Sequence, residues 1–469
     1  MIYVEKGREK PMYEQIYSEL VDEILSGALK AGETLPPTRS LAEELSVSRN
    51  TVDRAYQQLT AEGYIQAKPR SGFVVSSIPL DFGSGKKKTG ECARGGDEER
   101  KDQLHVRYDF SYGSMDNSVF PYKQWRRSLN NALSQMEATG VMRYPDRTGE
   151  LSLRREIARY LRAARDVECD PSQIVITSGQ QHSMEMIANM FEGGRKRFIM
   201  EEPGYDGIRK VFENHRYEID PVPVEEDGIV LEPLGVLSSA LLYVTPSHQF
   251  PTGAVTSIAK RRQLLQWAED TDSYVIEDDY DSELRYLTNP IPAMQALDTR
   301  GRTIYTGTFS KSLAPVMRTA YIVFPQELME RFMGYYQRYN SQVNTLHQLT
   351  LADFIASGSY QRHINRLRTT YRRKLNILME TAERVMGGKV KISGGDAGIH
   401  ILMEVESRFS LDQLLERAEA AGIRLYDTRA LYVCRENCPA NQLLLGFPTI
   451  PADALEPVME KLAEVWELR

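Results

Sequence analysis

The sequence predicts a multidomain chain: a small, mainly α-helical domain, then a larger α/β domain with a mostly parallel sheet, and a smaller C-terminal α/β domain. Three observations predict this fold class. Helical apolar spacing dominates up to residue 77, apolar residues nearly vanish from 78 to 107, and short β-rich runs alternate with helical segments beyond that point. At 469 residues the chain also exceeds one typical domain. The predicted boundaries are 1–77, 78–107, 108–345 and 346–469.

The composition is typical of a globular protein without membrane spans. The chain is 41% hydrophobic and 26% charged, and no apolar run approaches the roughly 20 residues that a span needs. Residues 1–7 lack the apolar core of a signal peptide, and four cysteines are too few for a disulfide framework, so we expect the cytoplasm. Cys434 and Cys438 lack a second pair or a histidine cluster, so no metal site is expected. The net charge of −7 does not exclude DNA binding by a small basic domain.

The first helices are predicted by an apolar stripe and by breaks at proline. Tyr13, Ile16 and Leu20 recur at helical spacing, and Pro36–Pro37 then interrupt the chain before a second, short helix. Ser48 is placed to cap a third helix, which Gly63 ends. Two β-rich runs flank residues 68–72 and predict a hairpin with a basic tip. Two short helices, a tight turn, a third helix and a hairpin together predict a winged helix-turn-helix.

This arrangement predicts contact with double-stranded operator DNA. The first residues of the recognition helix face base edges in the major groove, where Arg49 can form a bidentate pair with guanine. Asn50 and Thr51 follow it, and Arg39 reaches from the preceding helix. The wing residues are predicted to contact phosphate or the minor groove, namely Lys68 and Arg70. The alternative is a solvated helical domain with a charged face.

The stretch from 78 to 107 is predicted to be a flexible linker. It contains Gly-Ser-Gly-Lys-Lys-Lys-Thr-Gly and Gly-Gly-Asp-Glu-Glu-Arg-Lys-Asp, which cannot bury enough apolar surface to offset chain entropy. About thirty such residues span roughly 30 Å as a random coil. That length suffices to place the N-terminal domain over a neighbouring subunit.

Five short runs beyond the linker are predicted as strands of a mostly parallel sheet: 174–176, 198–200, 241–244, 274–276 and 303–305. Helical segments predominate beyond about residue 346, and 390–404 and 443–447 are predicted to supply strands of the smaller domain. Ligands of such sheets gather at the carboxyl ends of the strands. The residues at those ends therefore define the candidate site.

Two of these strand ends are suited to hold a phosphate. Gly179, Gln180 and Gln181 follow a strand and open a helix, where backbone amides and the helix dipole favour an anion. The loop after the last strand adds two hydroxyls and a guanidinium, from Thr308, Ser310 and Arg318.

The other strand ends are suited to hold a pyridine ring and an aldehyde. Tyr205 offers a ring for stacking, and Asp278 can pair with a pyridinium nitrogen. Tyr280 can donate to a phenolic oxygen, and Lys311 can form an imine. Each residue alone is weak evidence, but together they are the set that pyridoxal phosphate (PLP) requires, and they predict PLP as the cofactor.

Two segments of the chain resemble known families. Residues 35–42, 48–52 and 59–65 are similar to the GntR family of winged-helix regulators, and residues 107–469 look like a fold-type I aminotransferase. The runs Thr-Pro-Ser-His-Gln-Phe-Pro-Thr-Gly (245–253) and Glu-Asp-Asp-Tyr-Asp-Ser-Glu (277–283) are particularly close to the MocR/GabR family of PLP-dependent transcriptional regulators. Over essentially its full length the chain resembles that family.

The resemblance implies a domain-swapped homodimer that acts as a regulator rather than as an enzyme. PLP on Lys311 would meet a small amino-acid effector, forming an external aldimine that changes how the heads bind DNA, with a residual half-reaction of transamination allowed. Arg429 matches the family's carboxylate-binding arginine and is the candidate effector ligand. Tyr144 and Arg147 are candidates for contact with the partner subunit's phosphate, as a tyrosine makes in aminotransferase dimers.

The sequence departs from the related patterns at two positions. Aminotransferases usually carry Asn before Pro-Thr-Gly, where this chain has Phe250, with His248 and Gln249 as possible substitutes. The GABA-responsive member has an arginine where this chain has Gly207, which argues for a small effector with one carboxylate.

Two alternative functions remain open from the sequence. One is a catalytically active PLP aminotransferase with an autoregulatory DNA-binding head, which Phe250 disfavours. The other is a regulator whose larger domain has lost PLP and only dimerises, against which Lys311, Asp278, Tyr280 and Arg318 argue.

Overall fold

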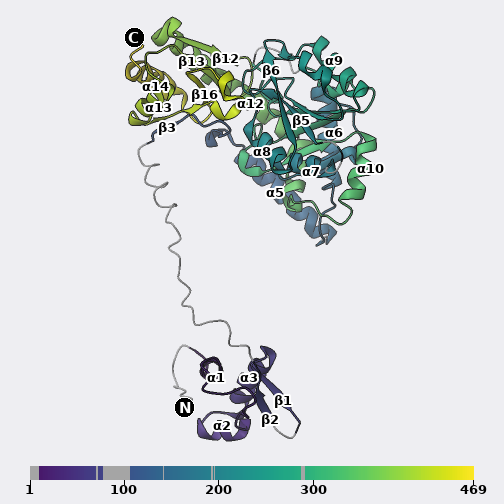
Figure 1. The fold of residues 1–469 in the computed structure, drawn as a ribbon, viewed down its shortest axis with the longest axis vertical. Helices are drawn as coiled ribbons and strands as arrows, with labels where there is room; N and C mark the ends of the chain where they lie inside the picture. Colours follow the sequence, from purple (N-terminus) through teal and green to yellow (C-terminus); the bar gives the residue numbers. More distant parts are fainter. Residues whose placement is uncertain are drawn as a thin grey trace. The chain divides into compact units, whose positions relative to one another are not determined.

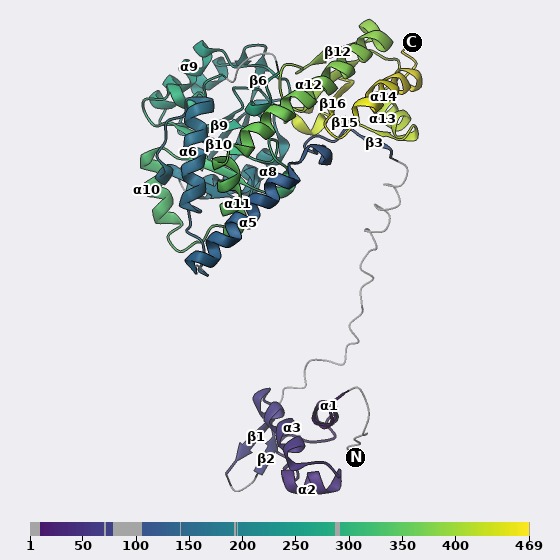
Figure 2. The same cartoon turned by 180° about the vertical axis from the view of Figure 1, so that it is seen from behind.

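The computed structural model describes residues 10–69, 72–77, 106–140, 142–191, 194, 196–286 and 291–468. The chain divides into two compact units, Met1–Glu98 and Glu99–Arg469, each of which is described by itself. The predicted linker falls almost entirely outside the described residues, as does Arg70. Figure 1 and Figure 2 show both units from opposite sides.

The N-terminal unit is the winged helix-turn-helix that the sequence predicts. Its elements are α1 (Met12–Leu25), α2 (Thr38–Glu44), α3 (Arg49–Ala61), β1 (Ile65–Lys68) and β2 (Gly72–Val75). The apolar stripe of α1 packs on α3 in a core of its own that includes Ile16, Leu20, Val52 and Leu59. Ser48 caps α3 as predicted, because its side chain accepts from the backbone N–H of Thr51. The two strands pair antiparallel, with Ile65 opposite Val75.

The larger unit contains an eight-stranded sheet in the order β4-β11-β10-β9-β8-β5-β6-β7. Its strands are β4 (Ile174–Thr177), β5 (Arg197–Glu202), β6 (Glu218–Glu225), β7 (Gly228–Ile229), β8 (Leu241–Val244), β9 (Tyr274–Asp279), β10 (Thr303–Thr308) and β11 (Ala320–Val323). The sheet is mostly parallel, as predicted, and β11 runs antiparallel to both its neighbours. Because β4, β5, β8, β9 and β10 share one direction, their carboxyl ends meet at one edge.

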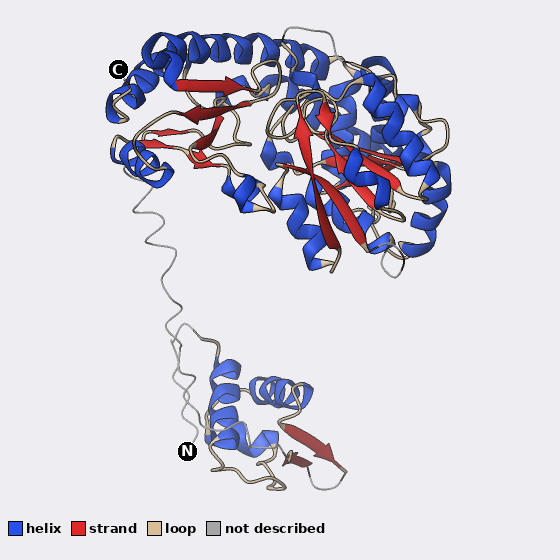
Figure 3. Ribbon diagram, turned by 45° about the horizontal axis from the view of Figure 1, so that its top comes forward, coloured by secondary structure: helices blue, strands red, loops and turns tan. Residues whose placement is uncertain are grey.

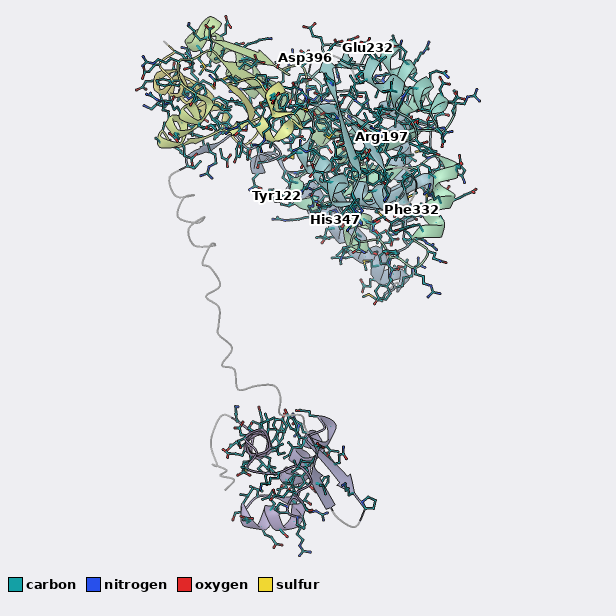
Figure 4. All side chains as sticks on the ribbon, viewed as in Figure 1. Tyr122, Arg197, Glu232, Phe332, His347 and Asp396 are labelled. Atoms are coloured by element: carbon teal, nitrogen blue, oxygen red, sulfur yellow. The ribbon has the colours of Figure 1, made fainter. Side chains whose placement is uncertain are left out.

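Helices cover both faces of this sheet. They are α5 (Tyr122–Thr139), α6 (Leu151–Arg165), α7 (Gln180–Met190), α8 (Asp206–Asn214), α9 (Ile258–Asp270), α10 (Gln326–Tyr335) and α11 (Thr345–Ala356). Successive residues of β4 show the two faces: Val175 joins the core under α7 and α8, while Ile174 and Ile176 join the core under α6. Phe332 of α10, labelled in Figure 4, belongs to the first of these cores. Burial on both faces explains why these strands read as continuous apolar runs.

A smaller four-stranded antiparallel sheet lies beyond α12 (Ser359–Met386), in the order β12-β13-β16-β15. Its strands are β12 (Val390–Ser393), β13 (His400–Val405), β15 (Tyr426–Asp427) and β16 (Gln442–Gly446), with helices α13 (Leu411–Ala420) and α14 (Ala452–Val465). Separately, β3 (Tyr108–Asp109) pairs with β14 (Ile423–Arg424). The strands of the larger unit form two groups in Figure 3. The split at residue 345 between them stays a prediction.

Candidate functional site

One cavity opens at the edge of the large sheet where the strand ends meet. All the residues predicted to hold the cofactor line it except Gly179, which precedes α7 directly. The remaining lining residues were not predicted as cofactor ligands: Tyr112, Tyr243, Thr245, Phe250 and Pro315. The structure thus brings together side chains more than 130 residues apart in the sequence, from Gln180 to Arg318.

Asp278 carries an unpaired oxygen inside this cavity wall. The Tyr243 hydroxyl donates to Asp278 Oδ2 at 2.5 Å, whereas the buried Oδ1 has no hydrogen-bond partner among the described residues. Burial raises the pKa of this carboxyl to about 7, and the neighbouring polar side chains of Tyr243 and Gln180 oppose that shift. A buried acceptor without a donor is costly, and the ring N–H of a pyridinium would satisfy it. This oxygen therefore fits the nitrogen end of PLP.

Tyr243 is the partner that the sequence could not reveal. It lies inside β8, opposite Ile276 of β9, in a run that reads as apolar core. Side chains alternate along a strand, so Asp278 shares a face with Ile276 and lies diagonally across from Tyr243. The hydrogen bond between them depends on that register.

Lys311 follows β10 and extends into the same cavity. Its Nζ lies 3.8 Å from the centre of the Tyr112 ring. Burial lowers the pKa of the Lys311 amine to about 8, although Asp281 and Asp278 both favour its charged form. A lower pKa leaves more neutral amine near neutral pH, and the neutral amine is the form that attacks a carbonyl.

The phosphate end is formed by the start of α7 and by the loop after β10. Arg318 donates from Nη2 to the carbonyl of Ser178 at 3.3 Å, and Thr308 Oγ1 accepts from the backbone N–H of Ser310 at 3.1 Å. Gly179 has φ +103°, and a Cβ there would lie 2.6 Å from Arg318 Nη2. A glycine at 179 is therefore required for the Arg318 guanidinium to lie this close to the start of α7. Hydroxyls, guanidinium and helix N-terminus together suit a dianion.

Aromatic rings form the walls of the cavity. The ring centres of Tyr205 and Phe250 are 5.7 Å apart, and those of Phe250 and Tyr280 are 6.1 Å apart, both edge to face. A Cβ at Gly207 would come within 2.7 Å of the Tyr205 ring, so a larger residue at 207 requires Tyr205 to move. The glycine therefore permits the observed position of the predicted stacking ring.

The structure distinguishes the two residues that precede Phe250. Gln249 does not line the cavity, because its amide donates to the carbonyl of Pro203 at 2.8 Å and accepts from the Thr252 hydroxyl at 2.7 Å. His248 does not line the cavity either, but its Nδ1 lies 3.0 Å from the Tyr280 hydroxyl. Of these two residues, His248 is the one in contact with the predicted cofactor ligand Tyr280.

Arg429 does not line the cavity in this structure. Its Nη2 forms ion pairs with Asp412 at 2.9 Å and with Asp427 at 2.8 Å, and its side chain is exposed. The loop that follows is attached to the end of β5, because Glu202 Oε1 accepts from the backbone N–H groups of Val433 and Cys434 at 2.7 Å. The effector-binding role of Arg429 stays a prediction.

Tyr144 and Arg147 lie on the surface of the larger unit. The Tyr144 side chain is 82% exposed, and Arg147 donates to the carbonyl of Met333 at 3.2 Å. Neither lines the cavity within the described chain. Their predicted contact with a partner subunit is compatible with this exposure and stays a prediction.

In the N-terminal unit, most of the predicted DNA-binding residues face outward. Arg39, Arg49, Asn50 and Lys68 are exposed. Arg49 pairs with Asp53 at 3.5 Å and Arg39 with Glu43 at 3.3 Å, both on exposed helix faces where such pairs are weak. The Thr51 hydroxyl lies 2.7 Å from Ser48 Oγ and so takes part in the helix cap. The DNA contacts of all these residues stay predictions.

The described part of the chain contains no group of three or more His, Cys, Asp or Glu side chains placed to bind a metal ion. Among the same residues, no helix combines the length and the apolar character that crossing a membrane requires.

Fold and site define the class of protein: a fold-type I aminotransferase-like domain, whose cofactor is PLP, joined to a winged helix-turn-helix head. Residues 12–75 match the bacterial regulatory proteins of the gntR family, and residues 109–461 match aminotransferase class I and II. The chain belongs to the MocR/GabR family of transcriptional regulators, in which these two parts are fused.

Relatives match over nearly the whole chain. The HTH-type transcriptional regulator YdeL of Bacillus subtilis (strain 168) is 37% identical over 466 residues, 99% of both chains. The probable rhizopine catabolism regulatory protein MocR of Rhizobium meliloti is 35% identical, over 90% of this chain and 87% of that protein. The multiple substrate aminotransferase of Thermococcus profundus has a TM-score of 0.71 at 23% identity, over 80% of this chain and 94% of that one, which shows the fold.

Proposed function

We propose that this chain is a cytoplasmic transcriptional regulator that binds operator DNA through its N-terminal unit and senses a small amino acid at Lys311. One observation carries the proposal: a partly buried amine and the unpartnered oxygen of Asp278 belong to the same cavity. That pair is what PLP needs at its aldehyde and at its ring nitrogen. Because the same chain carries a winged helix-turn-helix unit, we infer that ligand binding in this cavity regulates transcription and does not serve metabolism.

The cofactor and the chain have separate tasks in this proposal. When bound, PLP supplies a carbonyl that combines with amines and a ring that withdraws electrons. Lys311 would hold the carbonyl carbon, Asp278 would keep the ring nitrogen protonated, and Arg318 would hold the phosphate. An amino acid that took the place of Lys311 would free its amine beside Asp281 and Asp278, and both carboxyl groups favour the charged form of that amine. The new charge can shift the population of conformations, and this shift is the proposed signal.

The effector is proposed to be small and to carry one carboxylate. The cavity walls are aromatic, from Tyr205, Phe250 and Tyr280, and Gly207 supplies no cation beside them. Arg429 is proposed to bind the effector carboxylate after exchanging Asp412 and Asp427 for it. Both pairs are solvent-accessible, so this exchange has a low electrostatic cost.

A homodimer, domain-swapped as in the family, is part of the proposal. Exposed apolar side chains cluster in three segments of the larger unit: Leu133, Met142, Tyr144, Met333, Tyr335 and Tyr339. Such side chains are covered when a partner subunit packs on them.

The first experiment is a visible absorption spectrum of the purified protein, followed by titration with small D- and L-amino acids. We expect a yellow protein whose colour is lost on borohydride reduction, and a spectral change with one amino acid or a few related ones. Operator affinity, measured in parallel, is expected to change at the same effector concentration. A protein that stays colourless after incubation with PLP would contradict the proposal and leave a DNA-binding dimeriser.

The second candidate function is a catalytically active aminotransferase with an autoregulatory head. It predicts release of a keto acid on each turnover, which the same titration detects. The observation against it is Phe250, which supplies an apolar ring where aminotransferases usually place an amide. Multiple turnovers with a keto-acid acceptor would favour this candidate over the sensor.

Arg49→Ala is expected to weaken specific operator binding by about 1–3 kcal/mol, because a bidentate contact to guanine is lost. Fluorescence anisotropy with labelled operator DNA measures the loss at fixed salt. Arg54→Ala is the matched control, since that guanidinium on the same helix stacks on the Tyr13 ring, 4.1 Å from its centre. Unchanged operator affinity in Arg49→Ala would remove this residue from the base-reading role.

A further inference from the structure

A buried chain of three side chains lies directly behind the cavity. His248 Nδ1 is 3.0 Å from the Tyr280 hydroxyl and 2.9 Å from Asp281 Oδ2. All three residues are buried, and only Tyr280 lines the cavity. Both contacts use the same ring nitrogen, so the position of one proton decides how the whole group is bonded.

Only one assignment of donors and acceptors satisfies both contacts of His248 Nδ1. An ionised Asp281 carboxylate only accepts, so Nδ1 must carry a proton to contact it. A protonated Nδ1 cannot accept from Tyr280, so the phenol oxygen can only accept at this contact. The single phenol proton of Tyr280 is therefore left to point elsewhere, and the cavity is the side that this residue lines.

The other ring nitrogen of His248 supports the same assignment. Nε2 is buried and has no hydrogen-bond partner among the described residues. A proton on Nε2 would be a buried donor without an acceptor, which is costly, whereas a proton on Nδ1 has Asp281 at 2.9 Å. The Asp281 carboxylate therefore holds the ring with a proton on Nδ1, as the second partner of a histidine commonly does.

We propose that Asp281 and His248 are positioning residues that aim the phenol proton of Tyr280 at the phenolic oxygen of PLP. The inference rests on the proposed function, because it needs the cofactor on Lys311. It also accounts for Phe250: the amide that aminotransferases usually place there is absent, and the histidine two residues earlier acts on the same oxygen through Tyr280. The direct donors are thus reduced from two, an amide and a phenol, to the Tyr280 phenol alone. His248, on the side of Tyr280 away from the cavity, fixes the direction of that hydroxyl group.

With PLP on Lys311, this arrangement would act on the proton shared between the phenolic oxygen of the cofactor and the Lys311 nitrogen. A hydrogen bond from Tyr280 stabilises negative charge on the oxygen most when that shared proton has left. Losing the hydrogen bond from the Tyr280 hydroxyl should therefore raise the pH at which this shared proton dissociates. The other titratable or charged side chains near this site are not substituted in any of the variants: Tyr112, Tyr205, Tyr243, Asp278, Asp281, Lys311 and His400.

The experiment is a pH titration of the visible absorption of the full-length protein with PLP bound. Four proteins are compared: the unmodified chain, His248→Phe, Tyr280→Phe and the double variant. We expect His248→Phe to raise the midpoint by about one pH unit, Tyr280→Phe to raise it at least as much, and the double variant to match Tyr280→Phe alone. Asp281 is left intact, because its charge acts on Lys311 directly and its loss would move the midpoint the opposite way.

The double variant separates positioning from a merely structural role. If His248 acts only through Tyr280, its removal has no further effect once the phenol is gone. Additive shifts, or an unchanged midpoint in His248→Phe, would overturn the proposal while leaving PLP on Lys311. His248→Leu, which also lacks the Nδ1 group, provides the same comparison if His248→Phe does not take up PLP. An unmodified protein without a borohydride-sensitive visible band would instead contradict the proposed function itself.

Discussion

Lys311→Ala is expected to abolish the response of operator binding to the amino-acid effector, while operator affinity in the absence of effector stays within about twofold. The substitution removes the only atom of this residue that can bond to the cofactor carbonyl, so an amino acid no longer displaces anything. The N-terminal unit has a core of its own, built on α1 and α3, and does not depend on Lys311 for its fold. Anisotropy with labelled operator, repeated across effector concentrations, measures both quantities.

Lys210→Ala is the control for this experiment. Lys210 lies on α8 with a side chain that is 69% exposed, and its partner is the exposed Glu213. This variant should keep both the visible spectrum and the effector response. A Lys311→Ala protein that responds to effector over the same concentrations would contradict sensing at Lys311, even if PLP binds elsewhere.

Arg165→Met is expected to lower the stability of the larger unit by about 3–5 kcal/mol, because it leaves a buried carboxylate without its cation. Arg165 Nε lies 2.7 Å from Asp279 Oδ2, and the two side chains are 2% and 3% exposed. The guanidinium also donates to Ser247 Oγ at 2.7 Å and to the carbonyl of Ile291. Urea denaturation followed by near-ultraviolet circular dichroism measures the loss.

Arg197→Met is the matched control for the buried pair. Arg197, labelled in Figure 4, pairs with Asp220 at 2.8 Å, but its side chain is 42% exposed. An exposed pair contributes little because water screens it, so we expect a loss below about 1 kcal/mol. Equal losses in the two variants would show that burial does not govern the Arg165–Asp279 pair.

In the acidic run 277–279, the sequence predicted the role of one carboxylate but not the partners of the other two. The sequence predicted that Asp278 faces the cofactor, and it lines the cavity. Its neighbours have structural partners that no local pattern indicates: Glu277 accepts from the backbone N–H groups of Met294 and Gln295 at 2.7 and 2.8 Å, and Asp279 pairs with Arg165. The three adjacent carboxylates thus have three different sets of partners. These partners come from segments of the chain that are distant in sequence.

Local and periodic features determined much of this protein from sequence alone. The stripe of α1, the Ser48 cap, the apolar runs of the large sheet and the residues at their carboxyl ends depend on propensity, periodicity and parallel strand direction, which neighbours in the sequence encode. From these features the winged helix-turn-helix, the α/β class and PLP as cofactor could be predicted.

Tertiary structure alone decided which side chains complete the site. The Tyr243–Asp278 bond depends on the register of β8 against β9, and the His248–Asp281 contact joins residues 33 positions apart. The family resemblance predicts that Arg429 binds the effector, whereas its partners in this structure are Asp412 and Asp427. A hydrogen bond or ion pair requires placement within a few tenths of an ångström, and the packing of whole elements, rather than the identity of a residue, supplies that accuracy.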